Sequence, residues 1–363
     1  MVDDNFFQSL KNSIENARSD QIEIGEQKRN IKRICVITDD FDDYEQRFKY
    51  GDEMAEKYGS EILKIFLYNI ETLLKKQYSV DEFKESPQEL VQAIKNHSTH
   101  IKELKETNVR IVLDSTAREL LYALRDLRQN DSEENELSVT DATALTDFLL
   151  TNMDRERNIS YTIGELLKEY KPQIIYFKPP LLRNRESISE EGFNYVTLQI
   201  LKKKPNGTWV MMRGKKGVSD VKKVVFFLLG GQDLPTVLRG AHAAVSVLPD
   251  IENVNMQYVV LMDQKKVNMA SLVSETNSNE DLRQLLSKKM EEVVGNVKIG
   301  GKIPETTVKF GEIESDLPSI LEEMHPDLLF ISPKVTTDNQ FDQELLDVVL
   351  VAVQKNISVF VTY

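Results

Sequence analysis

The chain has 363 residues, of which 40% are hydrophobic and 29% are charged, so it can bury sizeable cores and its length suggests two domains. Its formal net charge of −13 argues against nucleic acid or an anionic membrane as the main partner, because both repel an acidic surface. A single cysteine, Cys35, excludes an internal disulfide, and it lies in the apolar run 34–37, where we expect a buried and unreactive side chain.

Residues 1–28 form a mostly polar N-terminal extension. Phe6, Phe7, Leu10 and Ile14 recur in it at helical spacing, which predicts a helix that docks on the body of the protein or on a second subunit. The segment has no signal-peptide pattern, and no run of about 18 apolar residues occurs in the chain, so we expect a cytoplasmic protein without membrane insertion.

Strand-like and helix-like segments then alternate in two successive sets. In the first set, strands are predicted at 34–38, 61–68, 109–113, 174–177 and 209–212, and helices at 44–58, 87–106 and 163–170. In the second set, strands are predicted at 224–229, 256–262, 307–310, 328–331 and 358–363, and helices at 235–247, 280–294, 317–324 and 341–353. Apolar runs separated by helices are typical of parallel sheets in α/β folds.

The two sets align with one another as an internal repeat. The stretch "IKRICVITDDFDDYEQRFK" from Ile31 aligns without gaps with "VKKVVFFLLGGQDLPTVLR" from Val221. The stretch "GELLKEYKPQIIYF" from Gly164 aligns with "PSILEEMHPDLLFI" from Pro318, and both contain a proline that we expect to end the helix. We therefore predict a first α/β domain at 29–213, a linker at 214–220 and a second α/β domain at 221–363.

The first domain carries an additional segment, 115–160, that has no counterpart in the second. Its residues 115–127 and 137–153 are predicted to be helices joined by the acidic turn 130–136. Such a hairpin at the carboxyl edge of a strand is a surface elaboration, a dimer contact or a lid over a ligand site.

The strand ending in "ITDD", the segment "YGDEMAEKYGSEILKIFLYN" and the repeated helix-Pro-strand pattern resemble the universal stress protein family. The resemblance implies two tandem domains of the adenine-nucleotide-hydrolase-like fold, each a five-stranded parallel sheet flanked by helices. In this family the fifth strand often pairs across a dimer axis. The resemblance thus implies that residues 208–213 and 358–363 pair with one another as a pseudo-dimer within the chain, with a homo-oligomer as the other arrangement.

Many members of this family bind ATP through an aspartate after the first strand and a glycine-rich loop after the fourth. Asp39 stands at the aspartate position and Asp40 follows it, but the loop position reads "KPPLLRNR" from Lys178, without glycine and with two prolines that lack N–H donors. In the second half the aspartate pair is replaced by Leu229 and Gly230, and the loop after Ile331 again lacks glycine. We therefore expect no cofactor, and ATP or AMP would not bind in the family manner.

Several residues remain candidates for a small-ligand site. The first half offers Asp39, Asp40, Lys178, Arg183 and Arg185, which the predicted topology places at strand ends. In the second half Gly230 and Gly231 are either an anion-binding turn or a simple tight turn. The acidic cluster 39–43 is either a divalent-cation site or a solvated helix cap, and its spacing matches no calcium-binding loop.

These features predict a binding or regulatory protein with degenerate nucleotide sites that acts in stress response through protein contacts, rather than an enzyme. Two alternatives stay open. One is a nucleotide-binding or nucleotide-hydrolysing enzyme with a divergent phosphate loop, and the other is a cytoplasmic regulatory partner of a membrane transporter.

Overall fold

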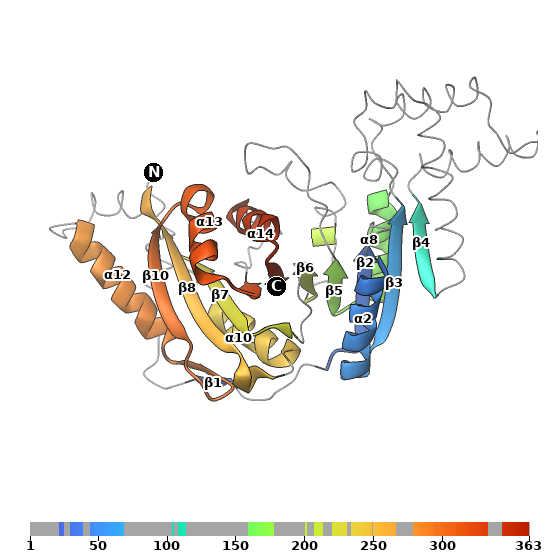
Figure 1. Cartoon of the computed structure of the whole chain (residues 1–363), viewed down its shortest axis with the longest axis horizontal. Coiled ribbons are helices and arrows are strands. Elements are labelled where there is room, and N and C mark those ends of the chain that lie inside the picture. The colour runs from blue at the N-terminus through green and yellow to red at the C-terminus, as the bar shows by residue number, and fades with distance from the viewer. Residues whose placement is uncertain are drawn as a thin grey trace, which may run out of the picture. The chain divides into compact units, whose positions relative to one another are not determined.

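The computed structural model (Figure 1) divides the chain into two compact units. The N-terminal unit comprises the described residues from Ile31 to Tyr176 together with 200–201, and the C-terminal unit comprises the other described residues. The residues that the structure describes are 22–24, 30–38, 44–68, 104, 108–113, 159–177, 200–201, 207–212, 220–230, 234–248, 250–265, 279–332 and 343–362. The predicted N-terminal helix, nearly all of the predicted helix 87–106 and residues 115–158 of the helical insert lie outside them.

The N-terminal unit contains a sheet whose strands follow the order β5-β2-β3-β4. The pairs β2–β3 and β3–β4 are parallel. Helix α2 packs on β2 and β3, and a side chain at Gly51 of α2 would place its Cβ 2.4 Å from Val36 Cγ2, so glycine is needed for this close approach. The elements are β2 (Arg33–Thr38), α2 (Tyr44–Tyr58), β3 (Glu61–Tyr68), β4 (Val109–Leu113), α8 (Ile159–Tyr170) and β5 (Ile174–Phe177).

The C-terminal unit contains a five-stranded parallel sheet in the order β10-β8-β7-β11-β12. Helices α13 and α14 contact one another (Figure 1). Helices α10 and α12 also contact one another. The elements are β7 (Lys223–Leu229), α10 (Leu234–Val247), the 3₁₀ turn η3 (Ile251–Asn253), β8 (Asn255–Asp263), α12 (Asn279–Val294), β10 (Glu305–Gly311), α13 (Ile313–Met324), β11 (Leu328–Ile331), α14 (Gln343–Gln354) and β12 (Ser358–Val361). These bounds confirm the predicted tandem α/β fold.

Strand β6 (Trp209–Met212) adds an antiparallel strand beside β12. It pairs with β12, with Met211 opposite Phe360, and all four of its residues are buried. The expected pairing between segments 208–213 and 358–363 is therefore present. The C-terminal strand of the chain consequently does not form an open edge on this side.

Aromatic side chains run across the C-terminal unit from strand to strand. Phe226 contacts Tyr258 and Phe330 at ring-centroid distances of 4.9 and 5.4 Å, and Phe330 in turn lies 5.1 Å from Phe360. Trp209 completes the row at 5.6 Å from Phe360. We call these five residues the aromatic row. Because they come from five neighbouring strands, each pair also stabilises the register of the sheet.

The two units repeat the same connection from helix to strand. Lys171 and His325 have positive φ angles of 49° and 45°, and their N–H groups bond to Leu167 and Leu321 as left-handed C-caps. Pro172 and Pro326 follow, so the predicted role of these prolines in ending the helix is confirmed.

The residue after each proline then clamps the start of the first strand of its unit. The side chain of Gln173 accepts hydrogen bonds from the N–H groups of Lys32 and Arg33, and the side chain of Asp327 accepts them from Lys222 and Lys223. The clamp therefore recurs at positions that the internal alignment makes equivalent, which is independent support for the duplication.

A small second sheet was not foreseen from the sequence. Strand β1 (Ile22–Ile24) pairs in parallel with β9 (Val297–Ile299). Ile24, Val297 and Ile299 are at most 2% exposed, so the pairing also buries apolar side chains. Part of the N-terminal extension is thus a strand of the C-terminal unit.

Candidate functional site

A cavity of about 170 Å³ lies at the carboxyl ends of three strands in the C-terminal unit. The carboxyl edge of a parallel sheet is where α/β proteins commonly bind ligands, because loops and helix N-termini converge there. We call it the C-terminal cavity. Its lining residues come from β7, β8, the β10–α13 junction and α14, and they are Leu229, Gly230, Leu261, Asp263, Lys265, Gly311, Glu312, Ile313, Glu314 and Glu344.

Two glycines at strand ends allow the close packing around this cavity. A Cβ on Gly230 would lie 3.2 Å from Met262 Cγ and 3.3 Å from Met262 Cα, and the Gly230 N–H bonds to the carbonyl oxygen of Leu261 at 2.8 Å. A Cβ on Gly311 would lie 2.7 Å from Asp316 Oδ2. A side chain at Gly311 would therefore displace a carboxylate of the polar network beside the cavity.

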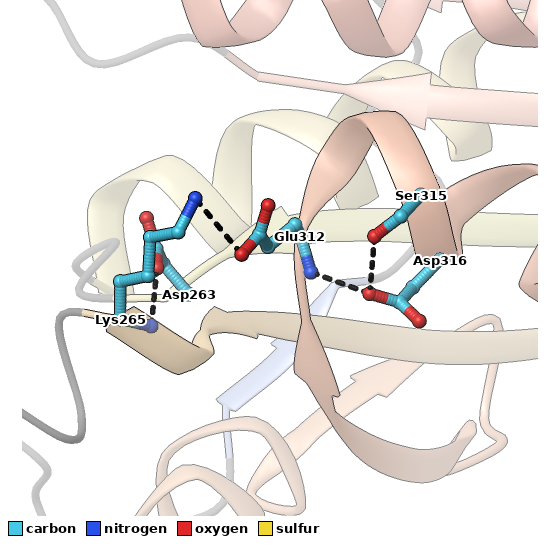
Figure 2. A network of polar contacts seen from close by, with 5 residues as sticks. All are labelled: Asp263, Lys265, Glu312, Ser315 and Asp316. Carbon is cyan, nitrogen blue, oxygen red and sulfur yellow. Dashed lines mark hydrogen bonds and ion pairs between the residues drawn. The ribbon is translucent and has the colours of Figure 1, made fainter.

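That polar network joins the end of β8 to the start of α13 (Figure 2). Lys265 Nζ lies 2.9 Å from Glu312 Oε1, and the backbone N–H of Lys265 donates to Asp263 Oδ1 at 2.8 Å. On the other side, Asp316 Oδ2 accepts the backbone N–H of Glu312 and the hydroxyl of Ser315, each at 2.8 Å. The network therefore links the carboxyl end of β8 to the start of α13 beside the cavity.

The network also shifts the pKa values of Lys265 and Asp316. The hydrogen bond to Glu312, followed by the charge of that carboxylate, raises the pKa of Lys265. The backbone N–H of Glu312, followed by the Ser315 hydroxyl, lowers the pKa of Asp316. An anion bound to the N–H of Glu312 would have to displace Asp316, because the chain places its own carboxylate there.

The lining of the C-terminal cavity is acidic. It contains the four carboxylates of Asp263, Glu312, Glu314 and Glu344 and one ammonium group, that of Lys265. Within the described ranges, no three His, Cys, Asp or Glu side chains are grouped as a metal ion would require. The carboxylates surround the cavity from three elements.

Of the residues predicted to bind a ligand, Gly230 lines the C-terminal cavity. Asp39, Asp40, Lys178, Arg183, Arg185 and Gly231 lie outside the described residues, so their roles stay predictions. Sequence reasoning did not single out Asp263, Lys265 or the glutamates of the lining. For two of them a signal appears only when the alignment of Gly164 with Pro318 is extended toward the N-terminus, where uncharged Asn158 and Ser160 fall opposite Glu312 and Glu314.

In the N-terminal unit the sequence analysis also missed a buried arginine. Arg47 of α2 is 0% exposed, and its Nη1 donates to Thr38 Oγ1 at 3.0 Å, at the end of β2. The ungapped alignment places Val237 at the equivalent position, so an arginine opposite a valine was the available signal. A guanidinium in this place needs hydrogen-bond partners, because burying a charge without them is costly.

Cys35 is buried, as the sequence predicts. It is 0% exposed in β2, and burial raises the pKa of its thiol, which keeps it protonated and unreactive.

Among the described residues, no helix combines the length and the apolar character needed to cross a lipid bilayer.

The fold and this site define a duplicated α/β protein with a small strand-end cavity in its second half. Comparisons with protein-family models and with curated proteins found no match. Among solved structures, the chain is similar to a protein of unknown function from Pseudomonas aeruginosa, at 11% identity and a TM-score of 0.43, with 92% of each chain covered. It is also similar to a universal stress protein from Archaeoglobus fulgidus, at 12% identity and a TM-score of 0.37, with 91% of this chain and 95% of that chain covered.

A further similar structure is a universal stress protein in complex with cAMP. It is 17% identical and has a TM-score of 0.23, and the match covers 40% of this chain and 98% of that chain. The cyclic nucleotide is a property of that protein.

Proposed function

We propose that this chain is a universal-stress-protein-like binding and regulatory protein of the cytoplasm. In this proposal the C-terminal cavity holds a small ligand, and the bound state is read out through protein contacts. In this proposal ATP does not bind through an aspartate after the first strand and a glycine-rich loop after the fourth. The observation that carries the proposal is the cavity at the carboxyl ends of β7, β8 and β10, with its built polar network and with Gly230 in its lining.

The chemistry of the cavity supports a ligand other than a nucleoside triphosphate. Pockets for drug-sized ligands enclose about 300–1,000 Å³, whereas this cavity encloses about 170 Å³. Four lining carboxylates would repel a triphosphate. In addition, the Glu312 N–H that could bind an anion at the start of α13 already has Asp316 as its acceptor.

The residues at the predicted nucleotide position of the first half support the same conclusion. The segment from Lys178 contains two prolines and no glycine, so it offers fewer N–H donors than a phosphate loop needs.

Thermal unfolding of the full chain tests the proposal, with ATP, AMP and small neutral or cationic molecules as ligands. We expect no stabilisation by ATP. We also expect native mass spectrometry of freshly purified protein to detect a small bound molecule. The variant Ile313→Trp, which puts a larger side chain in the lining, should no longer retain it. Circular dichroism of this variant controls for its folding. Stabilisation by ATP that disappears in the double variant Arg183→Ala, Arg185→Ala would contradict the proposal.

A further inference from the structure

We propose that strand β9 is an acceptor for an extended segment of a partner protein, and that β1 is the intramolecular segment with which the partner competes. The segment that fits alternates apolar, acidic and apolar residues, as Ile22, Glu23 and Ile24 do. We call Val297–Ile299 together with the following Gly300 the β9 acceptor. These residues do not line the C-terminal cavity, so this inference and the proposed function can fail independently.

The backbone of β1 is bound to the β9 acceptor as an added strand would be. The two strands are parallel. The N–H of Ile22 donates to the carbonyl oxygen of Asn296 at 2.8 Å, and the N–H of Gly300 donates to the carbonyl oxygen of Ile24 at 3.3 Å. In this mode of recognition main-chain bonds supply affinity, and contacts of alternate side chains supply specificity. A strand from another protein would form the same main-chain bonds.

The side chains of β1 show which segment the acceptor selects. Ile24 is 2% exposed and is the register partner of Ile299, which is 0% exposed. Helix α10 contacts both β1 and β9 and so covers the apolar side of the pair. Glu23 is exposed and is the register partner of Lys298. Opposite charges at directly facing positions of neighbouring strands stabilise the pairing. The acceptor therefore selects an acidic residue followed by an apolar one.

The β9 acceptor is held in place by contacts that do not involve β1. Just before β9, the N–H of Gly295 bonds to the carbonyl oxygen of Glu291 at the end of α12, at 2.7 Å. After β9, Ile299 and Lys302 exchange backbone hydrogen bonds of 2.7 and 3.1 Å. These bonds close the turn 300–301, whose two glycines have φ angles of 57° and 78°. The acceptor is thus preformed, and the incoming segment bears most of the cost of ordering.

The small size of β1 favours exchange. It has three residues, of which Ile24 alone is buried, and elements with few buried contacts open locally at a low cost in free energy. Because β1 belongs to the same chain, its effective concentration at the acceptor is on the order of millimolar. A partner protein present at a lower concentration must therefore add contacts beyond the three paired residues.

Fluorescence anisotropy of a labelled peptide with the sequence "SDQIEIGE", residues 19–26, tests the inference on the full chain. In the chain variant Ile24→Asp, β1 loses its buried side chain and leaves the acceptor open. We expect this variant to bind the peptide at least about tenfold more tightly than the unmodified chain does, because the tethered competitor is removed. Ile24→Ala should give an intermediate affinity. A peptide that itself carries Ile24→Asp should not bind.

A charge exchange tests the register. The peptide with Glu23→Lys should bind the Ile24→Asp chain about two- to fivefold more weakly than the original peptide does, as the loss of an exposed charge pair predicts. Adding Lys298→Glu to that chain should reverse the preference between the two peptides. Equal binding of both peptides by both chains would mean that the segment does not pair in this register, and would overturn the inference.

Leu285→Asp is the matched control. It places the same charge at a residue of α12 that is 47% exposed and lies outside the acceptor, so peptide binding should stay as weak as in the unmodified chain. Stronger binding in this control would overturn the inference. Circular dichroism and the fluorescence of Trp209 report the folding of each variant.

Two further results would also overturn the inference. One is a folded Ile24→Asp chain that does not bind the peptide, or unfolding of both Ile24 variants, because β1 would then be a fixed part of the unit. The other is a dimer of the unmodified chain, detected by analytical ultracentrifugation, that Ile24→Asp abolishes. Such a dimer would assign the acceptor to β1 of a second copy instead of another protein.

Discussion

The two halves share a fold but differ in what fills equivalent positions. In the C-terminal unit Phe226 and Val237 occupy the first strand and the helix that follows it, where the N-terminal unit has Val36 and Arg47. The second half thus has an aromatic row across its sheet, and the first half has a buried guanidinium at a strand end. Strand pairing and the helix-Pro-strand connection are the same in the two halves. The duplicated backbone therefore accommodates aromatic side chains in one half and a buried arginine in the other.

The largest expected effect tests the aromatic row. Phe226→Ala should lower the free energy of unfolding by about 3–5 kcal/mol, because the cavity it leaves lies between Tyr258 and Phe330. Val36→Ala, at the aligned position, should cost about 0.5–3 kcal/mol. Urea unfolding followed by tryptophan fluorescence measures the first variant through Trp209. Equal losses in the two variants would show that the row has no special role.

The second prediction concerns the buried arginine. Arg47→Val installs the residue that the other half uses, and it should still destabilise the protein by about 1–3 kcal/mol, because it removes the bond to the buried Thr38 hydroxyl. Denaturant unfolding of this variant gives the value. A stability equal to that of the unmodified chain would mean that the N-terminal unit accepts the aliphatic interior of its counterpart.

A smaller effect is expected at the clamps on the first strands. Gln173→Ala and Asp327→Ala each remove an acceptor for two backbone N–H groups, and each should cost about 0.5–1.5 kcal/mol. The comparison predicts similar losses in the two halves, measured by thermal unfolding. Asp327→Asn keeps one oxygen acceptor and serves as the control. A loss in one half alone would mean that the clamps are not equivalent.

The smallest expected effect is the contribution of the Asp316 carboxylate to stability, which should depend on pH. Hydrogen bonds lower the pKa of Asp316 below its ordinary 3.8, so its contribution to stability is fully present above that value and is lost as the pH falls through the lowered pKa. Asp316→Asn should therefore unfold at a lower temperature than the unmodified chain near neutral pH. The difference should shrink below pH 3.8. A difference that stays constant across this range would contradict the proposed role of the carboxylate.

The sequence predicted the strands and helices of both units well where apolar runs alternate with amphipathic segments. Strands β3, β4, β5 and β6 begin and end as predicted. The short strands β1 and β9 were missed because they have three residues each and pair over a separation from Ile22 to Val297, which local pattern cannot reveal.

The candidate site was less predictable than the fold. Gly230 could be predicted as a candidate ligand-binding residue because it directly follows a predicted strand. The acidic lining depends on which strand ends and helix starts meet in space, and Asp263 and Glu344 are far apart in the chain. For Glu312 and Glu314 the sequence gives a signal only when the internal alignment is extended upstream of Gly164 and Pro318, because uncharged residues then stand opposite the two glutamates.

Strands β1 and β6 have a consequence for the architecture of the chain. Ile22–Ile24 precedes the N-terminal unit and Trp209–Met212 follows it, yet both strands belong to the C-terminal unit. In topological terms the first half is an inserted domain, anchored at its entry and at its exit. A protease that cut the linker after β6 would leave the two fragments joined through backbone hydrogen bonds of β6 and β1, so a nicked molecule should migrate as one particle until it is denatured.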